Sequence, residues 1–102
     1  MASGVPADFS ADQWGVILGG SSGFGLATAQ KLARHGMSLA VVHRDRRAAL
    51  ARIEPQFEKI RAAGPRPVTF NTDALDPERR ALVLGELEAA LGASGRVRLL
   101  LH

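Results

Sequence analysis

The chain has 102 residues, of which 46% are hydrophobic, so we expect one small folded domain rather than a disordered segment. It contains no cysteine, which excludes disulfide bonds and thiolate metal sites. The formal net charge is +3, but tyrosine is absent and the arginines are not interleaved with aromatic side chains, so we expect no nucleic-acid partner.

The sequence also lacks the patterns of a membrane span and of an export signal. A membrane-spanning helix needs about 20 consecutive apolar residues, and no run in the chain approaches that length. The first ten residues have neither the basic start nor the apolar core of a secretory signal. We therefore expect no membrane association and a cytoplasmic location.

The first 13 residues mix glycine, proline, serine and aspartate without periodicity, so residues 1–13 are expected to form a flexible lead-in. The folded domain is expected over residues 14–102. Its first element is a short apolar run at residues 14–18, which predicts a buried strand. A glycine-rich turn follows over residues 19–25.

A helix is expected directly after this turn, because apolar residues recur at helical spacing at Leu26, Ala29 and Ala33. Gly36 provides its C-terminal stop. The run Leu-Ala-Val-Val within residues 38–43 then predicts a second buried strand.

Residues 48–63 predict a second, amphipathic helix that ends at Gly64. Its apolar positions are spaced by three, four and three residues: Leu50, Ile53, Phe57 and Ile60. Pro55 removes a backbone donor from the interior of this pattern. The helix is therefore expected to kink there, or to break and restart with Pro55 in a first turn.

A strand, a helix and a strand complete the chain. The first of these strands is expected over residues 67–71 and the second over residues 97–101. Between them, Asp76-Pro77-Glu78 predicts a helix start, with a capping carboxylate, a proline at the first helical position and an acid near the positive end of the dipole. The predicted apolar face of this helix is Leu84, Leu87 and Leu91, and Gly92 ends it.

Strands and helices thus alternate with short connections, which implies right-handed crossovers and a parallel sheet. We predict the α/β class, with a Rossmann-like doubly wound sheet of about four strands in the order 3-2-1-4 and three helices. This arrangement is half of the complete fold and is incomplete without further strands.

The glycine-rich turn carries the strongest indication of function. Gly19 permits a tight exit from the strand, Gly23 lets a phosphate approach the backbone, and Gly25 lets the helix pack closely on the strand. Backbone N–H groups at the helix start, around Phe24, point toward the place where an anion would bind. The alternative is a glycine-rich turn that only packs.

Two hydroxyl groups add to this anion site, because Ser21 and Ser22 can donate hydrogen bonds to phosphate oxygens. The whole turn, Gly-Gly-Ser-Ser-Gly-Phe-Gly at residues 19–25, resembles the cofactor loop Thr-Gly-x-x-x-Gly-x-Gly of the short-chain dehydrogenase/reductase family. Leu18 replaces the usual threonine, and Phe24 takes the place of an isoleucine.

The resemblance extends over residues 14–102 and implies that the chain is the N-terminal, cofactor-binding half of an oxidoreductase. The usual Asn-Asn-Ala-Gly after the fourth strand is missing. His102 at that place is more similar to the enoyl-acyl-carrier-protein reductase branch of the family.

The choice of cofactor is predicted from the end of the second strand. Arg44 lies 19 positions after Gly25, close to the ~20 at which the ribose-recognising residue is expected. An acid there would hold the hydroxyls of an NAD ribose, whereas an arginine favours the 2′-phosphate of NADP. We therefore predict NADP(H), with NAD as the alternative. The neighbouring Asp45 could face the ribose itself or cap the following helix.

The resemblance also implies an adenine site. An aspartate after the third strand of the family accepts a hydrogen bond from the adenine amino group, and the next residue lines the adenine pocket. Asp73 and Ala74 match these two positions. The alternative for Asp73 is a strand-end aspartate that forms a turn.

Catalytic residues are not expected in this chain, so by itself it is not expected to be active. The family's general acid is a tyrosine in a Tyr-x-x-x-Lys pair, and the chain has no tyrosine. His35 and His43 are expected to be isolated polar side chains rather than members of a metal or relay cluster.

The fourth predicted strand ends close to His102 and would present an unpaired edge. We therefore expect the C-terminal remainder of a reductase, or a second chain, to complete the sheet, and the complete enzyme to be a homo-oligomer. The alternatives are a stand-alone NADP-binding or sensing module and a structural interaction domain.

Overall fold

Four parallel strands form the central sheet of the computed structural model, which describes residues 8–65 and 67–102. The strands are β1 (Gln13–Leu18), β2 (Ser38–His43), β3 (Val68–Asn71) and β4 (Arg96–Leu101). The helices are α1 (Gly23–Arg34), α2 (Arg47–Ala63) and α3 (Pro77–Leu91). The strand order is β3-β2-β1-β4 with every neighbouring pair parallel, which confirms the predicted topology.

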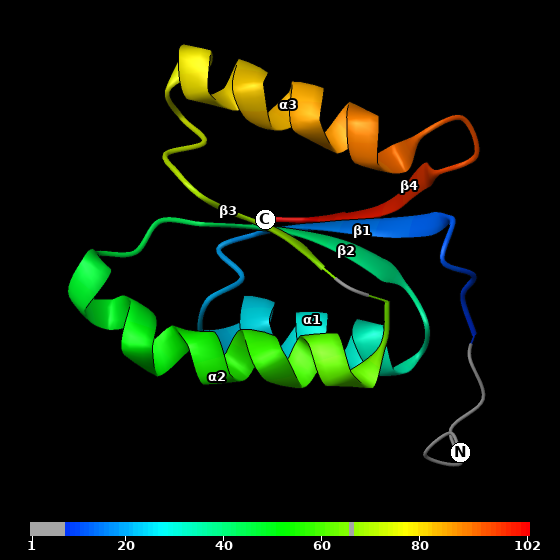
Figure 1. Ribbon diagram of the computed structural model, residues 1–102, viewed down its shortest axis with the longest axis horizontal. Helices are drawn as coiled ribbons and strands as arrows, with labels where there is room; N and C mark the ends of the chain where they lie inside the picture. Colours follow the sequence, from blue (N-terminus) through cyan, green and yellow to red (C-terminus); the bar gives the residue numbers. More distant parts are fainter. Residues whose placement is uncertain (1–7, 66) are drawn as a thin grey trace.

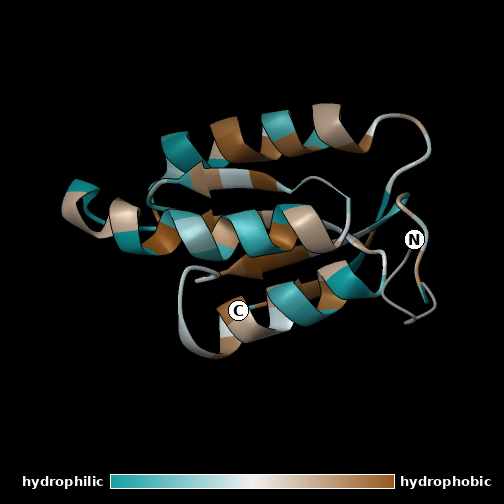
Figure 2. Ribbon diagram, turned by 60° about the horizontal axis from the view of Figure 1, so that its bottom comes forward, coloured by the Kyte–Doolittle hydropathy of each residue, from teal (hydrophilic) through white to brown (hydrophobic). Residues whose placement is uncertain are grey.

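The helices cover both faces of the sheet: α1 and α2 lie on one face, and α3 lies on the other (Figure 1). Strand β2 is buried at every position, because it has a strand on each side and helices on both faces. This burial explains its continuous apolar run. Figure 2 shows the same division, with mostly hydrophobic strands and helices that alternate between hydrophilic and hydrophobic residues.

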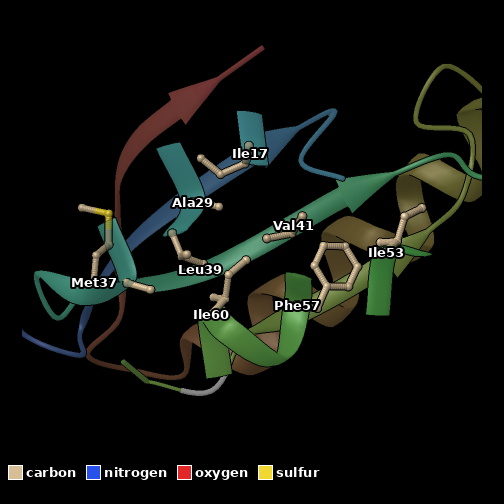
Figure 3. Packing of buried hydrophobic residues seen from close by; sticks show 9 residues of the cluster. Ile17, Ala29, Met37, Leu39, Val41, Ile53, Phe57 and Ile60 are labelled. Carbon is tan, nitrogen blue, oxygen red and sulfur yellow. The ribbon is translucent and has the colours of Figure 1, made fainter. Parts of the chain in front are cut away.

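The larger part of the core lies between the sheet and the helix pair α1 and α2 (Figure 3). Side chains from β1, β2 and α2 meet there, including Ile17, Leu39, Val41, Ile53, Phe57 and Ile60. Ala29 and Ala33 of α1 are fully buried, and their small side chains let this helix approach the sheet closely. A second cluster under α3 contains Trp14, Ala40, Val42, Phe70 and Leu87.

Helix α2 is one element from Arg47 to Ala63, so the predicted break at Pro55 is wrong. Pro55 is exposed, so water can reach the carbonyl group that loses its partner. On the opposite face, the buried side chains of Ile53, Phe57 and Ile60 hold both halves of the helix against the sheet.

Helix α3 begins as predicted, because the Asp76 side chain accepts hydrogen bonds from the N–H groups of Glu78 and Arg79, and Pro77 occupies the first turn. Its predicted apolar face is only partly correct. Within Pro77–Leu91 the buried residue is Leu87, whereas the side chain of Leu84 is 57% exposed. The spacing of the leucines correctly predicted a helix. The face of this helix that packs on the sheet is narrower than the predicted apolar face.

The predicted lead-in falls partly on residues 1–7, which lie outside the described part of the chain. From Asp8 onward the chain lies against α1. The N–H groups of Asp8 and Phe9 both donate to the carbonyl oxygen of His35, at 3.0 Å, and Phe9 packs against the core. The described residues contain no helix long and apolar enough to cross a membrane. They also contain no group of three or more histidine or acidic side chains that could hold a metal ion.

Substitution of Gly85 and of Gly64 by alanine is expected to change the free energy of unfolding in opposite directions. A Cβ at Gly85 meets nothing within 4 Å in the interior of α3, so Gly85→Ala should stabilise the protein by about 0.5–1 kcal/mol. A Cβ at Gly64 would overlap the carbonyl group of Ala33, so Gly64→Ala should destabilise it by about 1–3 kcal/mol. Urea unfolding of both variants measures the two changes, and a loss of stability in Gly85→Ala would contradict the described packing of α3.

Candidate functional site

The loops that follow β1, β2 and β3 meet at one edge of the sheet, on the left in Figure 1. The chain order reverses at this sheet between β1 and β4, and ligands of open α/β sheets bind at the carboxyl edge beside such a reversal. All of the predicted cofactor-binding residues lie in these loops or in the first turn of α1: Gly19, Ser21, Ser22, Gly23, Phe24, Gly25, Arg44, Asp73 and Ala74.

The glycine turn is held against β2 and α1 by contacts that exclude larger side chains. The N–H groups of Gly19 and Gly20 donate to the carbonyl oxygen of Val42, at 2.8 and 3.3 Å. A Cβ at Gly25 would overlap the carbonyl oxygen of Gly19, and one at Gly20 would overlap the Val41 side chain. The sequence had not indicated Gly20, since its constraint comes from a strand that is distant in sequence.

Gly19 and Gly23 have a different reason to be glycine. Their φ angles are +76° and +57°, in the region that residues with a side chain rarely adopt. A Cβ at either position would meet nothing within 4 Å. The space above Gly23 is therefore open, so that a ligand can contact the backbone directly.

The N-terminus of α1 is also open. Ser22 is its N-cap residue and has extended backbone angles, but its side chain makes no capping hydrogen bond within the described structure. The first turn contains no acidic residue, and Phe24 is 78% exposed. The first N–H groups of a helix have no partner inside the helix, so they and the helix dipole favour an anion here.

Ser21 differs from Ser22, because it is buried and faces a side chain rather than open space. Its hydroxyl group and then His43 hold the pKa of the Asp45 carboxyl below its usual range, although burial opposes them. Asp45 therefore does not cap α2, whose N-cap is Arg46 without a side-chain capping bond in the described structure. Of the two alternatives for Asp45, the capping role is therefore wrong, and the carboxylate bonds His43 instead.

The expectation that His35 and His43 are isolated polar side chains is wrong. The Nδ1 atom of His43 lies 2.8 Å from Oδ2 of Asp45, and that of His35 lies 2.7 Å from Oδ2 of Asp8. His43 is 5% exposed, and its ring meets that of Phe57 edge-on, with centroids 5.0 Å apart. The last residue of β2 is thus buried beneath the loop that carries Asp45.

Asn71, at the end of β3, fixes the backbone of this loop. Its Oδ1 accepts from the N–H of Asp45 at 2.9 Å, and its Nδ2 donates to the carbonyl oxygen of Asp45 at 3.1 Å. No sequence pattern predicted this role, since an exposed asparagine after a strand usually forms a local turn. Here it joins the β2–α2 loop to β3.

Arg44 and Asp73, which are distant in sequence, form an ion pair at this edge. Nη1 of Arg44 lies 3.4 Å from Oδ2 of Asp73, and the Arg44 side chain is 75% exposed. The other oxygen of Asp73 accepts from the N–H of Leu75 at 2.9 Å, so the turn proposed as its alternative role is present. Arg44, Asp45, Asn71 and Asp73 line a polar cleft of about 440 Å³.

A separate apolar cleft has a volume of about 580 Å³. Gly19 and Ala74 both contribute to its lining, together with Leu18, Val42 and Leu75. Arg80 of α3 also lines it, and its Nη1 lies 3.5 Å from the carbonyl oxygen of Ala74. The glycine turn and the β3–α3 loop therefore share one apolar space.

Asp45→Asn is expected to lower stability at neutral pH by about 1 kcal/mol, because a charge-assisted bond to His43 becomes a neutral one. The folded pKa of Asp45 is lowered, so its carboxylate stabilises the protein above the unfolded pKa of about 3.9. That contribution is lost as the pH falls through the lower folded pKa. Urea unfolding of both proteins from neutral to acidic pH measures this, and a stability difference that persists unchanged in acid would contradict it.

No protein-family model and no curated protein matches the sequence. Solved structures do match. The apo-form glucose dehydrogenase of Caenorhabditis elegans has a TM-score of 0.70 and 24% identity, over 88% of this chain and 36% of that chain. A short chain dehydrogenase from Mycobacterium thermoresistibile has a TM-score of 0.65 and 24% identity, over 79% of this chain and 30% of that chain.

A dehydrogenase/reductase from Sinorhizobium meliloti has a TM-score of 0.68 and 29% identity, over 87% of this chain and 34% of that chain. The chain therefore spans about a third of the length of each of these structures. The chain therefore has a fold similar to that of about a third of each of these dehydrogenases.

Proposed function

We propose that this chain is the cofactor-binding part of an NADP(H)-dependent short-chain dehydrogenase/reductase. The observation that carries the proposal is the open N-terminus of α1 above the glycine turn, at the same edge of the sheet as Arg44 and Ala74. A dinucleotide needs these three features together: donors for a pyrophosphate, a polar group for the ribose and an apolar space for the adenine.

The glycine turn fits a pyrophosphate. Gly23 leaves its backbone accessible, and the close packing of Gly25 on Gly19 brings the start of α1 beside it. The first-turn N–H groups would donate to the phosphate oxygens, and the hydroxyl group of Ser22 is exposed beside them. Ser21 lies in the same turn, and its hydroxyl group would be a further donor to the phosphates.

Arg44 is the residue that we propose for the 2′-phosphate. It is exposed at the end of β2, and α2 begins with Arg46 as N-cap and without an acid in its first turn. Cations at a helix N-terminus are unfavourable, and a bound phosphate would relieve that conflict. To bind the phosphate, Arg44 would have to leave its ion pair with Asp73 or bind both groups at once. The Asp73 side chain is 31% exposed, and it can keep its hydrogen bond to the N–H of Leu75.

The apolar cleft beside Ala74 is proposed to hold the adenine. Asp73 precedes Ala74 in the chain and lines the polar cleft. Each of its carboxylate oxygens has two lone pairs, so it could accept from an adenine amino group while it keeps its bond to Leu75. Leu18 and Val42, at the ends of β1 and β2, would pack against the base.

When bound, the nicotinamide of NADP(H) supplies or accepts a hydride. The residues of this chain would bind and orient the cofactor, while the catalytic Tyr and Lys are proposed to lie outside it, because the chain has no tyrosine. We further propose that a C-terminal remainder or a second chain pairs with the free edge of β4. Val97 and Leu100 of β4 are 47% and 66% exposed. The complete enzyme is proposed to be a cytoplasmic homo-oligomer.

Titration of the chain with NADPH and NADH, followed by nucleotide fluorescence and thermal stability, tests the cofactor. Arg44→Ala should weaken NADPH binding about 10- to 100-fold, the usual effect of losing charge-assisted hydrogen bonds, and should leave NADH nearly unchanged. An equal loss for both nucleotides would overturn the choice of NADP. If the wild-type chain binds neither nucleotide, the cofactor-binding role and the stand-alone NADP-binding module are both excluded. The structural interaction domain is then the alternative that remains.

Gly23→Ala tests the pyrophosphate site and has a matched control in Gly92→Ala. Both glycines have positive φ and an open position for a Cβ, so both variants should lose about 1 kcal/mol of stability. Only Gly23→Ala places a methyl group where the phosphates would lie. Gly23→Ala should therefore lose binding of both NADPH and NADH. Gly92 is the C-cap residue of α3, so Gly92→Ala should bind both nucleotides normally. Equal nucleotide binding by the two variants would contradict the site.

A further inference from the structure

Asn71 lies where the two loops that carry Arg44 and Asp73 leave the sheet. It is the last residue of β3 and pairs in register with His43, the last residue of β2. The N–H of Thr72 adds one more bond between the two chains, to the carbonyl oxygen of His43 at 2.8 Å. The chains then diverge, because α2 and α3 lie on opposite faces of the sheet (Figure 1).

The side chain of Asn71 extends the pairing of β2 and β3 beyond the ends of these strands. Its Oδ1 accepts from the N–H of Asp45 at 2.9 Å, and its Nδ2 donates to the carbonyl oxygen of Asp45 at 3.1 Å. One amide group therefore supplies the acceptor and the donor that a neighbouring strand supplies inside a sheet. A side chain of similar size without an amide, such as aspartate or leucine, could not make both bonds.

This arrangement restricts the backbone of Arg44. The loop between β2 and α2 consists of residues 44–46. Arg44 is flanked in the chain by His43, which is bonded to Thr72, and by Asp45, which is bonded to Asn71. Its Cα therefore has little freedom to shift relative to β3, whereas its side chain is 75% exposed. The bonds of Asn71 thus fix the point from which the guanidinium group extends.

The chain segment that contains Asn71 also places the acid that faces Arg44. Asp73 follows Asn71 by two residues, and its Oδ2 lies 3.4 Å from Nη1 of Arg44. Its Oδ1 accepts from the N–H of Leu75 at 2.9 Å. Asn71 lines the polar cleft of about 440 Å³ together with Arg44 and Asp73. Asn71 therefore controls how the cation and its competing acid are placed relative to each other.

We propose that Asn71 is a positioning residue for the choice of NADPH over NADH. It acts through Arg44 rather than on the cofactor, because both polar atoms of its side chain are bonded to Asp45. Without these bonds, the loop has to be ordered when the 2′-phosphate binds, and the lost backbone freedom weakens binding. NADH has no 2′-phosphate, so its affinity does not include this loss. This inference rests on the proposed function.

Asn71→Ala tests the role of this side chain, by fluorescence titration of the full chain with NADPH and NADH at constant pH and salt. The affinity for NADPH should fall about tenfold, the scale of the net contribution of one hydrogen bond. The affinity for NADH should change by less than about twofold, the usual error of additivity. An equal loss for both nucleotides, or no loss for either, would overturn the proposal.

Asn71→Leu is the second variant, and it keeps a side chain of similar size and a good strand former at the end of β3. It removes both bonds to Asp45 and should give the same two results as Asn71→Ala. The residue is exposed, so neither substitution disturbs the core. If Asn71→Ala does not fold, the change in the NADPH to NADH ratio of Asn71→Leu decides.

A double-mutant cycle with Arg44→Ala separates positioning of Arg44 from general support of this edge of the sheet. In the Arg44→Ala background, the further change Asn71→Ala should alter the affinity for NADPH by less than about twofold. The interaction through which Asn71 acts is then already missing. Fully additive losses would show that Asn71 acts independently of Arg44, and would overturn the proposal.

Gln13→Ala is the matched control. Its Oε1 likewise accepts from a backbone N–H, that of Ser10 at 3.0 Å, but Gln13 begins β1 and therefore lies at the opposite edge of the sheet from Asn71. This variant loses a bond of the same kind and should bind both nucleotides as the wild type does. A fall in the NADPH to NADH ratio as large as that of Asn71→Ala would contradict a specific role of Asn71.

The two proposals fail in different ways. If the wild type binds neither nucleotide, the proposed function is overturned, and the role of Asn71 with it. If Arg44→Ala weakens NADPH binding alone while Asn71→Ala changes neither affinity, the proposed function stands and only the role of Asn71 is overturned.

Discussion

The contact between Gly25 and the carbonyl oxygen of Gly19 is the constraint on which the candidate site depends. It brings the first turn of α1 onto the end of β1, and the chain between them passes through positive φ at Gly19 and Gly23. The helix dipole and the unpaired N–H groups then point into the space beside the turn. A larger side chain at residue 25 would separate helix from strand and remove this alignment, so the anion site is a consequence of packing.

Most of the fold follows from the sequence because its signals are local and agree with one another. The apolar run in β2, the stop at Gly36 and the cap at Asp76 each specify one element, and alternation along the chain then leaves a parallel sheet as the simple solution. The continuous helix across Pro55 was not predictable from the residue itself. Whether the helix continues past Pro55 depends on whether that residue faces solvent. Burial of Ile53 and Phe57 against the sheet decides this orientation.

The site was predictable to a lesser degree, for a physical reason. Positions such as Gly25 and Arg44 are fixed by backbone geometry and by their distance along the chain, so the sequence locates them at the carboxyl edge. The partners of Asp45 depend on the direction of side chains in three loops, which no spacing encodes. Asn71 and His43 therefore emerged only from the structure, although His43 is the last residue of a correctly predicted strand.

Two ion pairs lie at the carboxyl edge of the sheet, and they affect how this edge could select a ligand. Arg44 is paired with Asp73, and Asp45 is paired with His43, so neither arginine nor carboxylate lacks a partner before a ligand arrives. A phosphate at Arg44 must therefore compete with Asp73, whereas Arg46 and Arg47 at the start of α2 have no acid in the first turn to balance them. Selectivity then depends on small differences between these competing interactions.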